Sequence, residues 1–203
     1  MWQFMELREA ANLKYWRVFY TMPRAEFRAE EELKEVKLEA FVPKMLVEKT
    51  VSGRKRRHEA PLFTSYLFAR VDEYERRKVV SHHHVMYCVK IGVEFGKVQP
   101  FEMEQLQMAA NDPARLSRIE YDRPGIGRRV MVTEGPMKGM IGWVIEHRGQ
   151  YDLVLRISAI RESVKVQVSL ADVRELDDEE ALDVKRRNRE EPKVVRVRSW
   201  ARK

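Results

Sequence analysis

The sequence predicts an α+β fold: an α/β sandwich built on one antiparallel sheet, then a linker and a small β-barrel. Three observations support this prediction. Short segments in which apolar residues alternate are interspersed with stretches of helical periodicity up to residue 110. Residues 111–123 begin with Asn111-Asp112-Pro113, carry several charges and run into Pro124-Gly125, a composition typical of a linker. Beyond them, five short alternating segments separated by turns indicate a small barrel.

The first expected strand, 15–20, is rich in aromatic and β-branched residues and follows a variable leader, 1–14. Pro23 ends this strand and precedes an amphipathic helix. The apolar residues of that helix recur at helical spacing: Ala29, Leu33, Val36 and Ala40. A second extended segment, 41–47, leads into a basic turn, 52–58, which we expect to project as a hairpin.

The next expected strand, 66–71, is apolar on both faces. Leu67, Ala69 and Val71 share one face, whereas Tyr66, Phe68 and Arg70 share the other. A short helix capped by Asp72 and ending at Val80, a strand at 85–89 and a helix opened by Pro100 complete this part.

These elements define domain boundaries along the chain. We predict the α/β domain at 15–110, the linker at 111–123, the barrel domain at 124–176 and a charged, disordered basic tail at 177–203. The barrel strands are expected at 128–133, 141–147, 151–157, 163–168 and 172–174.

Charge and composition restrict the partners. The chain has 39 basic and 32 acidic residues and a pI near 9.5, which favours a polyanionic partner or an acidic protein surface. Nine basic and two acidic residues lie between 185 and 203, so this final segment accounts for the whole net charge of +7. Cys88, the single cysteine, lies in an apolar run and is expected to be a small buried hydrophobe. With no signal peptide and no membrane-length apolar run, we expect a cytoplasmic protein without membrane contact.

The motifs of catalysis are missing from the sequence, so we expect neither an enzyme nor a cofactor. There is no glycine-rich phosphate loop, CxxC, HExxH or nucleophile elbow. His82-His83-His84 suggests a metal, but consecutive imidazoles do not all converge on one ion, and no Cys, Asp or Glu recurs at ligand spacing nearby. We therefore predict no metal site.

Residues 130–144 carry alternating valines interrupted by Gly135-Pro136, Gly139 and Gly142, which provide positive-φ or close-approach positions for a sharp reversal. This pattern resembles a KOW motif, the signature of small SH3-like barrels. Together with Trp16–Tyr20, Glu26 and Leu62–Phe68, it resembles the NusG family of transcription elongation factors over roughly residues 15–175. The segment 41–63 is more similar to RfaH-type paralogues, the specialised branch of that family.

The resemblance implies a transcription elongation and antitermination factor that binds the clamp of bacterial RNA polymerase and suppresses pausing or termination. An aromatic patch on the first sheet would make this contact. The candidate polymerase-binding residues are Tyr20, Phe41, Tyr66 and Phe68. On this hypothesis Tyr66→Ala or Phe68→Ala abolishes polymerase binding and leaves the fold intact. An alternative is that the domain's own helices cover this face.

The resemblance also implies contact with non-template DNA near the first helix, and the basic turn extends this surface. The candidate nucleic-acid-binding residues are Arg24, Arg28, Arg54, Lys55, Arg56, Arg57, His82 and His83. A solvated charged face is the alternative interpretation. A threonine-bearing element that RfaH-like factors use against the polymerase gate loop is replaced here by Arg76-Arg77-Lys78-Val79.

Family members recruit a ribosomal protein or the termination factor Rho through the barrel, which is expected to hang free on the linker of a monomeric protein. The candidates for this contact are apolar residues on the hairpin turn and the lysine between them, although a packing role explains the apolar ones equally well: Met137, Lys138, Met140 and Ile141. The competing functions are a KOW-containing ribosome- or RNA-associated binding protein and an adaptor that never touches nucleic acid.

Overall fold

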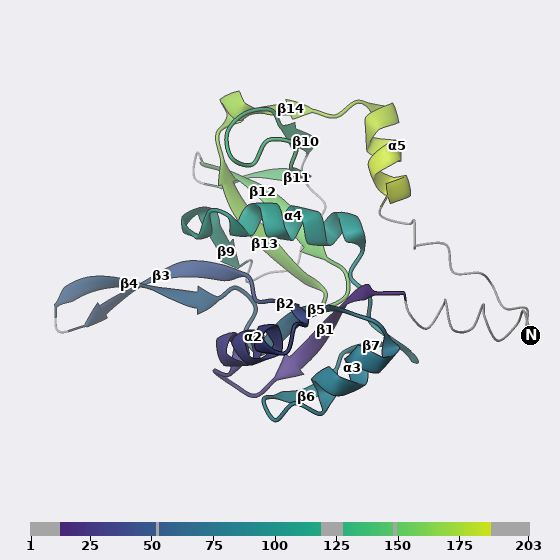
Figure 1. Cartoon of the computed structure of the whole chain (residues 1–203). Helices are drawn as coiled ribbons and strands as arrows, with labels where there is room; N and C mark the ends of the chain where they lie inside the picture. Colours follow the sequence, from purple (N-terminus) through teal and green to yellow (C-terminus); the bar gives the residue numbers. More distant parts are fainter. Residues whose placement is uncertain (1–12, 52, 119–127, 148–149, 188–203) are drawn as a thin grey trace, which may run out of the picture.

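A computed structural model describes residues 13–51, 53–118, 128–147 and 150–187 (Figure 1). The first part consists of β1 (Tyr15–Thr21), α2 (Glu26–Glu35), β2 (Glu39–Phe41), β3 (Lys44–Val51), β4 (Arg54–Pro61), β5 (Tyr66–Val71), α3 (Glu73–Val80), β6 (Val85–Cys88), β7 (Lys90–Ile91), β8 (Glu94–Phe95) and α4 (Pro100–Ala110). The second consists of η1 (Pro113–Arg115), β9 (Leu116–Arg118), β10 (Arg128–Val132), β11 (Ile141–His147), β12 (Gln150–Ile157), β13 (Glu162–Val168), η2 (Leu170–Asp172), β14 (Val173–Glu175) and α5 (Asp178–Arg187).

The first part is built on a four-stranded sheet in the order β2-β5-β1-β6, in which every pairing is antiparallel. Helices cover both of its faces. Leu67 and Phe19 pack in one apolar cluster with Leu33 of α2 and Val79 of α3. On the opposite face, residues including Val18 and Phe68 belong to a cluster with Met103, Leu106 and Ala109 of α4. The predicted antiparallel α/β arrangement is confirmed.

Local sequence explains where the helices begin and end. Asp72 caps α3 in a capping box, in which its carboxylate accepts from the Glu75 N–H and the Glu75 side chain accepts from the Asp72 N–H. The expected stripe of the first helix is too long, because α2 ends at Glu35. Lys37 takes a positive φ of 62° there, Val36 is 64% exposed, and Ala40 lies in β2.

The second part is a six-stranded antiparallel sheet in the order β14-β10-β11-β12-β13-β9. All five strands expected in this part are present, and the sixth, β9, comes from the segment predicted as a linker. Likewise, α5 occupies residues 178–187 of the segment predicted to be a disordered tail. The remaining tail, the leader up to residue 12 and linker residues 119–123 lie outside the described residues.

Glycines serve the turn before β11 in the two ways that the sequence predicted. Gly135 and Gly139 have φ values of 80° and 88°. Gly142 lies where a Cβ would meet the Val154 carbonyl oxygen at 2.6 Å, so any side chain there displaces the neighbouring strand. Close backbone approach at this position therefore requires glycine.

Helix α4 lies between the two sheets (Figure 1), and its polar side chains tie them together. The buried Gln105 accepts a hydrogen bond from the Ile141 N–H at 2.6 Å, and Glu102 accepts from the hydroxyl of Ser158 at 2.6 Å. The expectation of a freely hanging second part thus differs from this structure, in which the two sheets share one apolar cluster through α4.

Candidate functional site

Three tyrosines form a ladder across neighbouring strands of the first sheet. Tyr20 of β1 pairs directly with Tyr66 of β5 on one side and with Tyr87 of β6 on the other. The rings of Tyr20 and Tyr66 meet edge to face at 5.5 Å, whereas those of Tyr20 and Tyr87 stack at 5.1 Å. Tyr20 and Tyr66 are half-buried and Tyr87 is 49% exposed, so the ladder is partly open to solvent.

Phe68 was predicted to share this exposed patch, and that prediction is wrong. Its side chain does point away from Leu67, but α4 covers this face and Phe68 is completely buried. Its ring lies 6.0 Å from that of Phe63, which is also buried. Phe41 of β2 pairs with Phe68 of β5 and is half-buried against the same cluster. The exposed patch therefore consists of the tyrosine ladder alone, and Phe68 belongs to the apolar core against which Tyr66 packs.

Tyr66 lies where the second sheet approaches the ladder. Its pKa is raised, first by burial and then by the nearby carboxylate of Glu162, the first residue of β13. The Arg118 guanidinium of β9 donates a hydrogen bond to the Thr64 hydroxyl at 3.2 Å. Tyr66 is therefore a neutral phenol that offers a hydroxyl donor at the junction of the two parts.

The β3–β4 hairpin projects from the body of the molecule (Figure 1) and carries the basic residues that the sequence singled out. Directly opposed residues share a face. On one face, Glu48 opposes Arg57, binds it at 2.8 Å and lies 3.9 Å from Lys55. Nearer the base of that face, Lys44 binds Glu59 at 2.7 Å. The cations of this face are thus largely neutralised.

The other face of the hairpin is uncompensated. Lys49 opposes Arg56. Arg54 and His58 each lie two residues from Arg56 along β4, so all four side chains share that face. They are exposed, and no carboxylate of the described residues pairs with them. We call Lys49, Arg54 and Arg56 the free basic face. The sequence analysis had missed Lys49, and only the pairing register separates Arg54 and Arg56 from Lys55 and Arg57.

The histidine run meets a carboxylate of α2. Nε2 of His82 lies 3.1 Å from Oε2 of Glu32, and the Nε2 atoms of His83 and His84 lie 3.8 and 3.6 Å from its two oxygens. Burial works against ionisation of Glu32, but a hydrogen bond from Arg28 and the three imidazoles lower its pKa. Burial also lowers the pKa of His82.

The predicted nucleic-acid-binding residues of this region consequently differ in ion pairing and in exposure. Arg28 is bound to Glu32, and His82 is turned inward toward the same carboxylate. His83 keeps 66% of its side chain exposed. Arg24 is exposed at a positive φ of 64° in the turn before α2. The sequence predicted that the three imidazoles do not all converge on one ion, and only His82 and His83 face the same oxygen of Glu32. What the sequence did not indicate is Glu32 itself, which lies fifty residues away along the chain.

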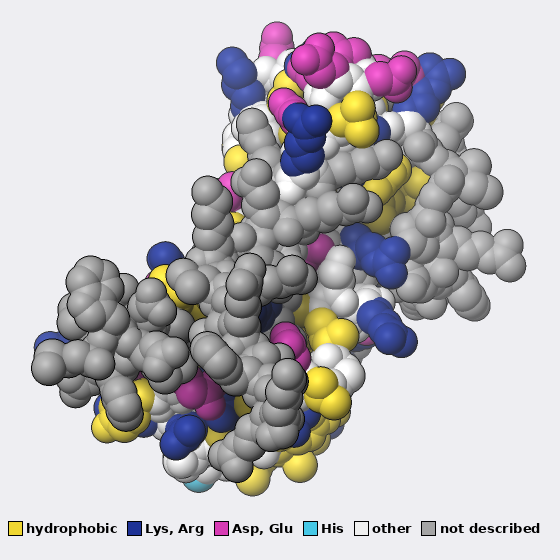
Figure 2. All heavy atoms as spheres, turned by 90° about the vertical axis from the view of Figure 1, so that its right-hand side faces the viewer, with side chains coloured by type: hydrophobic (Ala, Val, Ile, Leu, Met, Phe, Trp, Pro, Cys, Tyr) yellow, Lys and Arg dark blue, Asp and Glu magenta, His cyan; other side chains and the backbone are white. Residues whose placement is uncertain are grey.

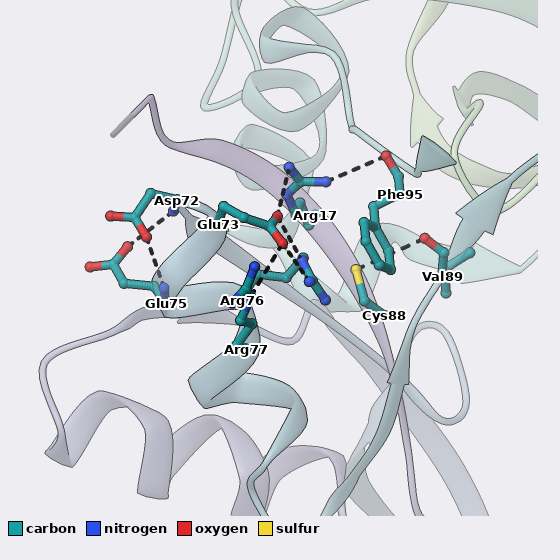
Figure 3. Close-up of polar contacts among 9 residues, drawn as sticks. All are labelled: Arg17, Asp72, Glu73, Glu75, Arg76, Arg77, Cys88, Val89 and Phe95. Carbon is teal, nitrogen blue, oxygen red and sulfur yellow. Dashed lines mark hydrogen bonds and ion pairs between the residues drawn. The ribbon is translucent and has the colours of Figure 1, made fainter. Parts of the chain in front are cut away.

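Both arginines of α3 face the same carboxylate, that of Glu73 (Figure 3). Arg76 binds Glu73 through two nitrogens, at 2.9 and 2.5 Å, and its guanidinium carbon stacks 3.8 Å from the centre of the Phe95 ring. The bond from Arg76 lowers the pKa of Glu73. Cys88 lies beneath this network, and burial raises its pKa to about 11. As expected, it is a small buried hydrophobe.

The turn before β11 buries two of its candidate contact residues. Met137 and Met140 are 2% and 0% exposed within the apolar cluster of the second sheet, so their prediction as a partner-binding pair is wrong. The chain folds back because Gly139 donates to the Val132 carbonyl and Met140 to that of Met137. Lys138 remains exposed and Ile141 half-buried.

On the side of the molecule drawn in Figure 2, acidic side chains gather at the end where α5 lies, and basic ones are scattered. Within the described ranges, no helix is both long and apolar enough to cross a bilayer.

Comparison with known proteins gives an assignment for the first part. Residues 14–110 match the model of the NusG family, described as transcription termination factor nusG. We call residues 14–110, which match this model, the NusG domain.

Two solved structures resemble the chain more broadly. A structure titled "Domain interaction in Thermotoga maritima NusG" is 20% identical, covers 81% of this chain and 98% of its own, and has a TM-score of 0.49. One of an MjSpt4:Spt5 complex is 12% identical over 80% of this chain and 97% of its own, with a TM-score of 0.25. Both scores lie below 0.5, so the assignment depends on the family match. The tyrosine ladder, the free basic face and the histidine cluster all lie within the NusG domain.

Proposed function

We propose that this protein is a bacterial, cytoplasmic transcription elongation factor whose NusG domain docks on RNA polymerase through the tyrosine ladder. The observation that carries the proposal is the row formed by Tyr66, Tyr20 and Tyr87 on a sheet face that is otherwise covered. Tyrosines contribute large rigid contact areas and a polar tip, and they are enriched among residues that dominate interface energy. The edge-to-face and stacked contacts fix the orientation of the three rings before a partner binds.

The free basic face supports a second contact, with nucleic acid. Cations that have no carboxylate partner release counterions from phosphate without first breaking an ion pair. Lys49, Arg54 and Arg56 meet this condition, whereas Arg57 does not. Non-template DNA exposed on the transcribing polymerase is the ligand that we propose for this face.

We further propose that the second sheet is a KOW domain with an SH3-like barrel fold, which recruits a ribosomal protein or Rho. With Met137 and Met140 buried, the contact falls to Lys138 and Ile141. The similarity of residues 41–63 to RfaH-type paralogues supports a specialised antitermination role without covalent chemistry.

Capture of core polymerase by the purified full chain tests the proposal. Tyr66→Ala and Tyr87→Ala are each expected to weaken capture at least tenfold. Tyr74→Ala is the matched control, because Tyr74 is a 68% exposed tyrosine of α3 outside the ladder. Equal capture by folded ladder variants and the control would contradict the proposal. Binding to ribosomes or RNA in place of polymerase would favour the RNA-associated alternative.

Pause assays on templates with and without an operon leader test the specialised role. We expect pausing to decrease only where the leader is present. A decrease on every template would indicate a general elongation factor instead.

A further inference from the structure

We propose that Glu32, His82 and His83 bind a divalent transition-metal ion of the zinc class. This site lies apart from the tyrosine ladder and does not depend on the function proposed above. Its ligand atoms, one from each of the three residues, all lie within 4.8 Å of one another. Zinc bonds of 2.0–2.2 Å place ligands of a tetrahedral site about 3.3–3.6 Å apart, so a shift of roughly an ångström closes the set.

Backbone geometry brings the imidazoles together. A turn in which Val85 donates to the His82 carbonyl at 2.9 Å reverses the chain between α3 and β6. The rings of His82 and His83 are consequently 4.8 Å apart, and those of His83 and His84 3.7 Å. The turn is held against β1 by the Met22 N–H, which donates to the His84 carbonyl at 3.0 Å. Glu32 reaches the cluster from the facing side of α2.

The two oxygens of Glu32 have different surroundings. Oε1 accepts a hydrogen bond from Arg28 at 3.1 Å and lies 3.6 Å from Nε2 of His84. Oε2 faces His82 and His83, yet it is buried and makes no hydrogen bond of good geometry within the described part of the chain. An unsatisfied buried carboxylate oxygen aimed between two imidazole nitrogens is the arrangement that a cation completes.

The donor set matches a borderline metal. Neutral imidazole nitrogen and a carboxylate oxygen suit zinc, copper, nickel and cobalt better than magnesium or calcium, which prefer oxygen alone. Binding through Nε2 requires the proton of His82 on Nδ1, which now accepts from the His84 N–H at 3.4 Å. That contact is longer than an ordinary hydrogen bond, so its loss costs little. Because His83 is largely exposed, water completes the coordination.

Calorimetric titration of the untagged full chain with zinc tests the proposal. We expect one tight site per chain, at least tenfold weaker in Glu32→Gln and in His83→Ala. Glu31→Gln is the matched control, an exposed carboxylate one residue away on α2, and should bind as the unaltered chain does. Thermal melts in metal-free buffer establish that each variant is folded.

Two results would overturn the proposal. Equal zinc affinity in Glu32→Gln would mean that the histidine run binds metal without the carboxylate. Absence of stoichiometric binding by the unaltered chain would mean that the cluster is an ion pair between imidazole and carboxylate.

Discussion

Replacement of Phe68 by alanine separates packing from partner binding in the NusG domain. Because Phe68 is completely buried between the sheet and α4, its removal leaves a cavity beneath the tyrosine ladder. Phe→Ala changes in such positions cost about 3–5 kcal/mol, a large part of a total stability of about 5–15 kcal/mol. With a urea m-value of about 2 kcal/mol/M, the midpoint of unfolding falls by about 1.5–2.5 M.

Tyr87→Ala provides the comparison. Tyr87 is 49% exposed and loses chiefly its stacking with Tyr20, which contributes about 0.5–1.5 kcal/mol. The assay is urea unfolding followed by tryptophan fluorescence and circular dichroism, beside polymerase capture under conditions where each variant is folded. An unchanged midpoint for Phe68→Ala, together with lost capture, would refute this reasoning and restore Phe68 to the contact surface.

Three further predictions follow from the contacts described above. Arg56→Gln is expected to reduce the slope of log K against log[salt] for single-stranded DNA binding by about 0.7. Arg57→Gln, with the same change in net charge, should have a smaller effect because Glu48 already neutralises Arg57. Equal slopes for the two variants, measured by fluorescence anisotropy, would contradict a face-specific contact. Gly142→Ala forces the strands apart and should cost about 1–3 kcal/mol in urea unfolding, and an unchanged midpoint would show that β12 yields easily. Burial raises the pKa of Glu102 although hydrogen bonds from Ser158 oppose it, so the folded state holds this proton more tightly than the unfolded chain does. The stability contribution of Glu102 therefore falls as pH rises through the folded pKa. The difference in unfolding free energy between the unaltered chain and Glu102→Gln should favour the unaltered chain more at pH 5 than at pH 7.5, and the opposite sign would contradict the assignment.

The sequence predicted the strands and their faces well because alternation and turn chemistry are local properties. The periodicity of 66–71 placed Leu67 and Phe68 on opposite faces, as observed. The glycine spacing around the start of β11 likewise predicted positions that need a positive φ or a close approach; Gly135 and Gly139 are of the first kind and Gly142 is of the second. Such signals lie within a few residues of the feature that they specify.

Exposure was predicted less well because alternation does not say what packs on a face. Phe68 lies on the expected face of β5 and Met140 in the expected turn, and both are covered by other parts of the chain. The ion pairs of the hairpin were hidden for a similar reason. They depend on the register that opposes Glu48 to Arg57, which neither strand encodes alone. Glu32 and His82 meet only through tertiary structure.

The residue types along β1 and β5 nevertheless indicate where the part of the sheet buried under α4 ends. Along β5 the same face carries Phe68 and then Tyr66, and along β1 it carries Val18 and then Tyr20. In both strands the purely apolar residue belongs to the cluster with α4, and the tyrosine comes one step further along, where exposure begins. A phenol hydroxyl is costly inside that cluster and useful at its rim. The paired change from apolar residue to tyrosine thus marks the boundary between the core and the exposed tyrosine ladder, a signal that single strands do not reveal.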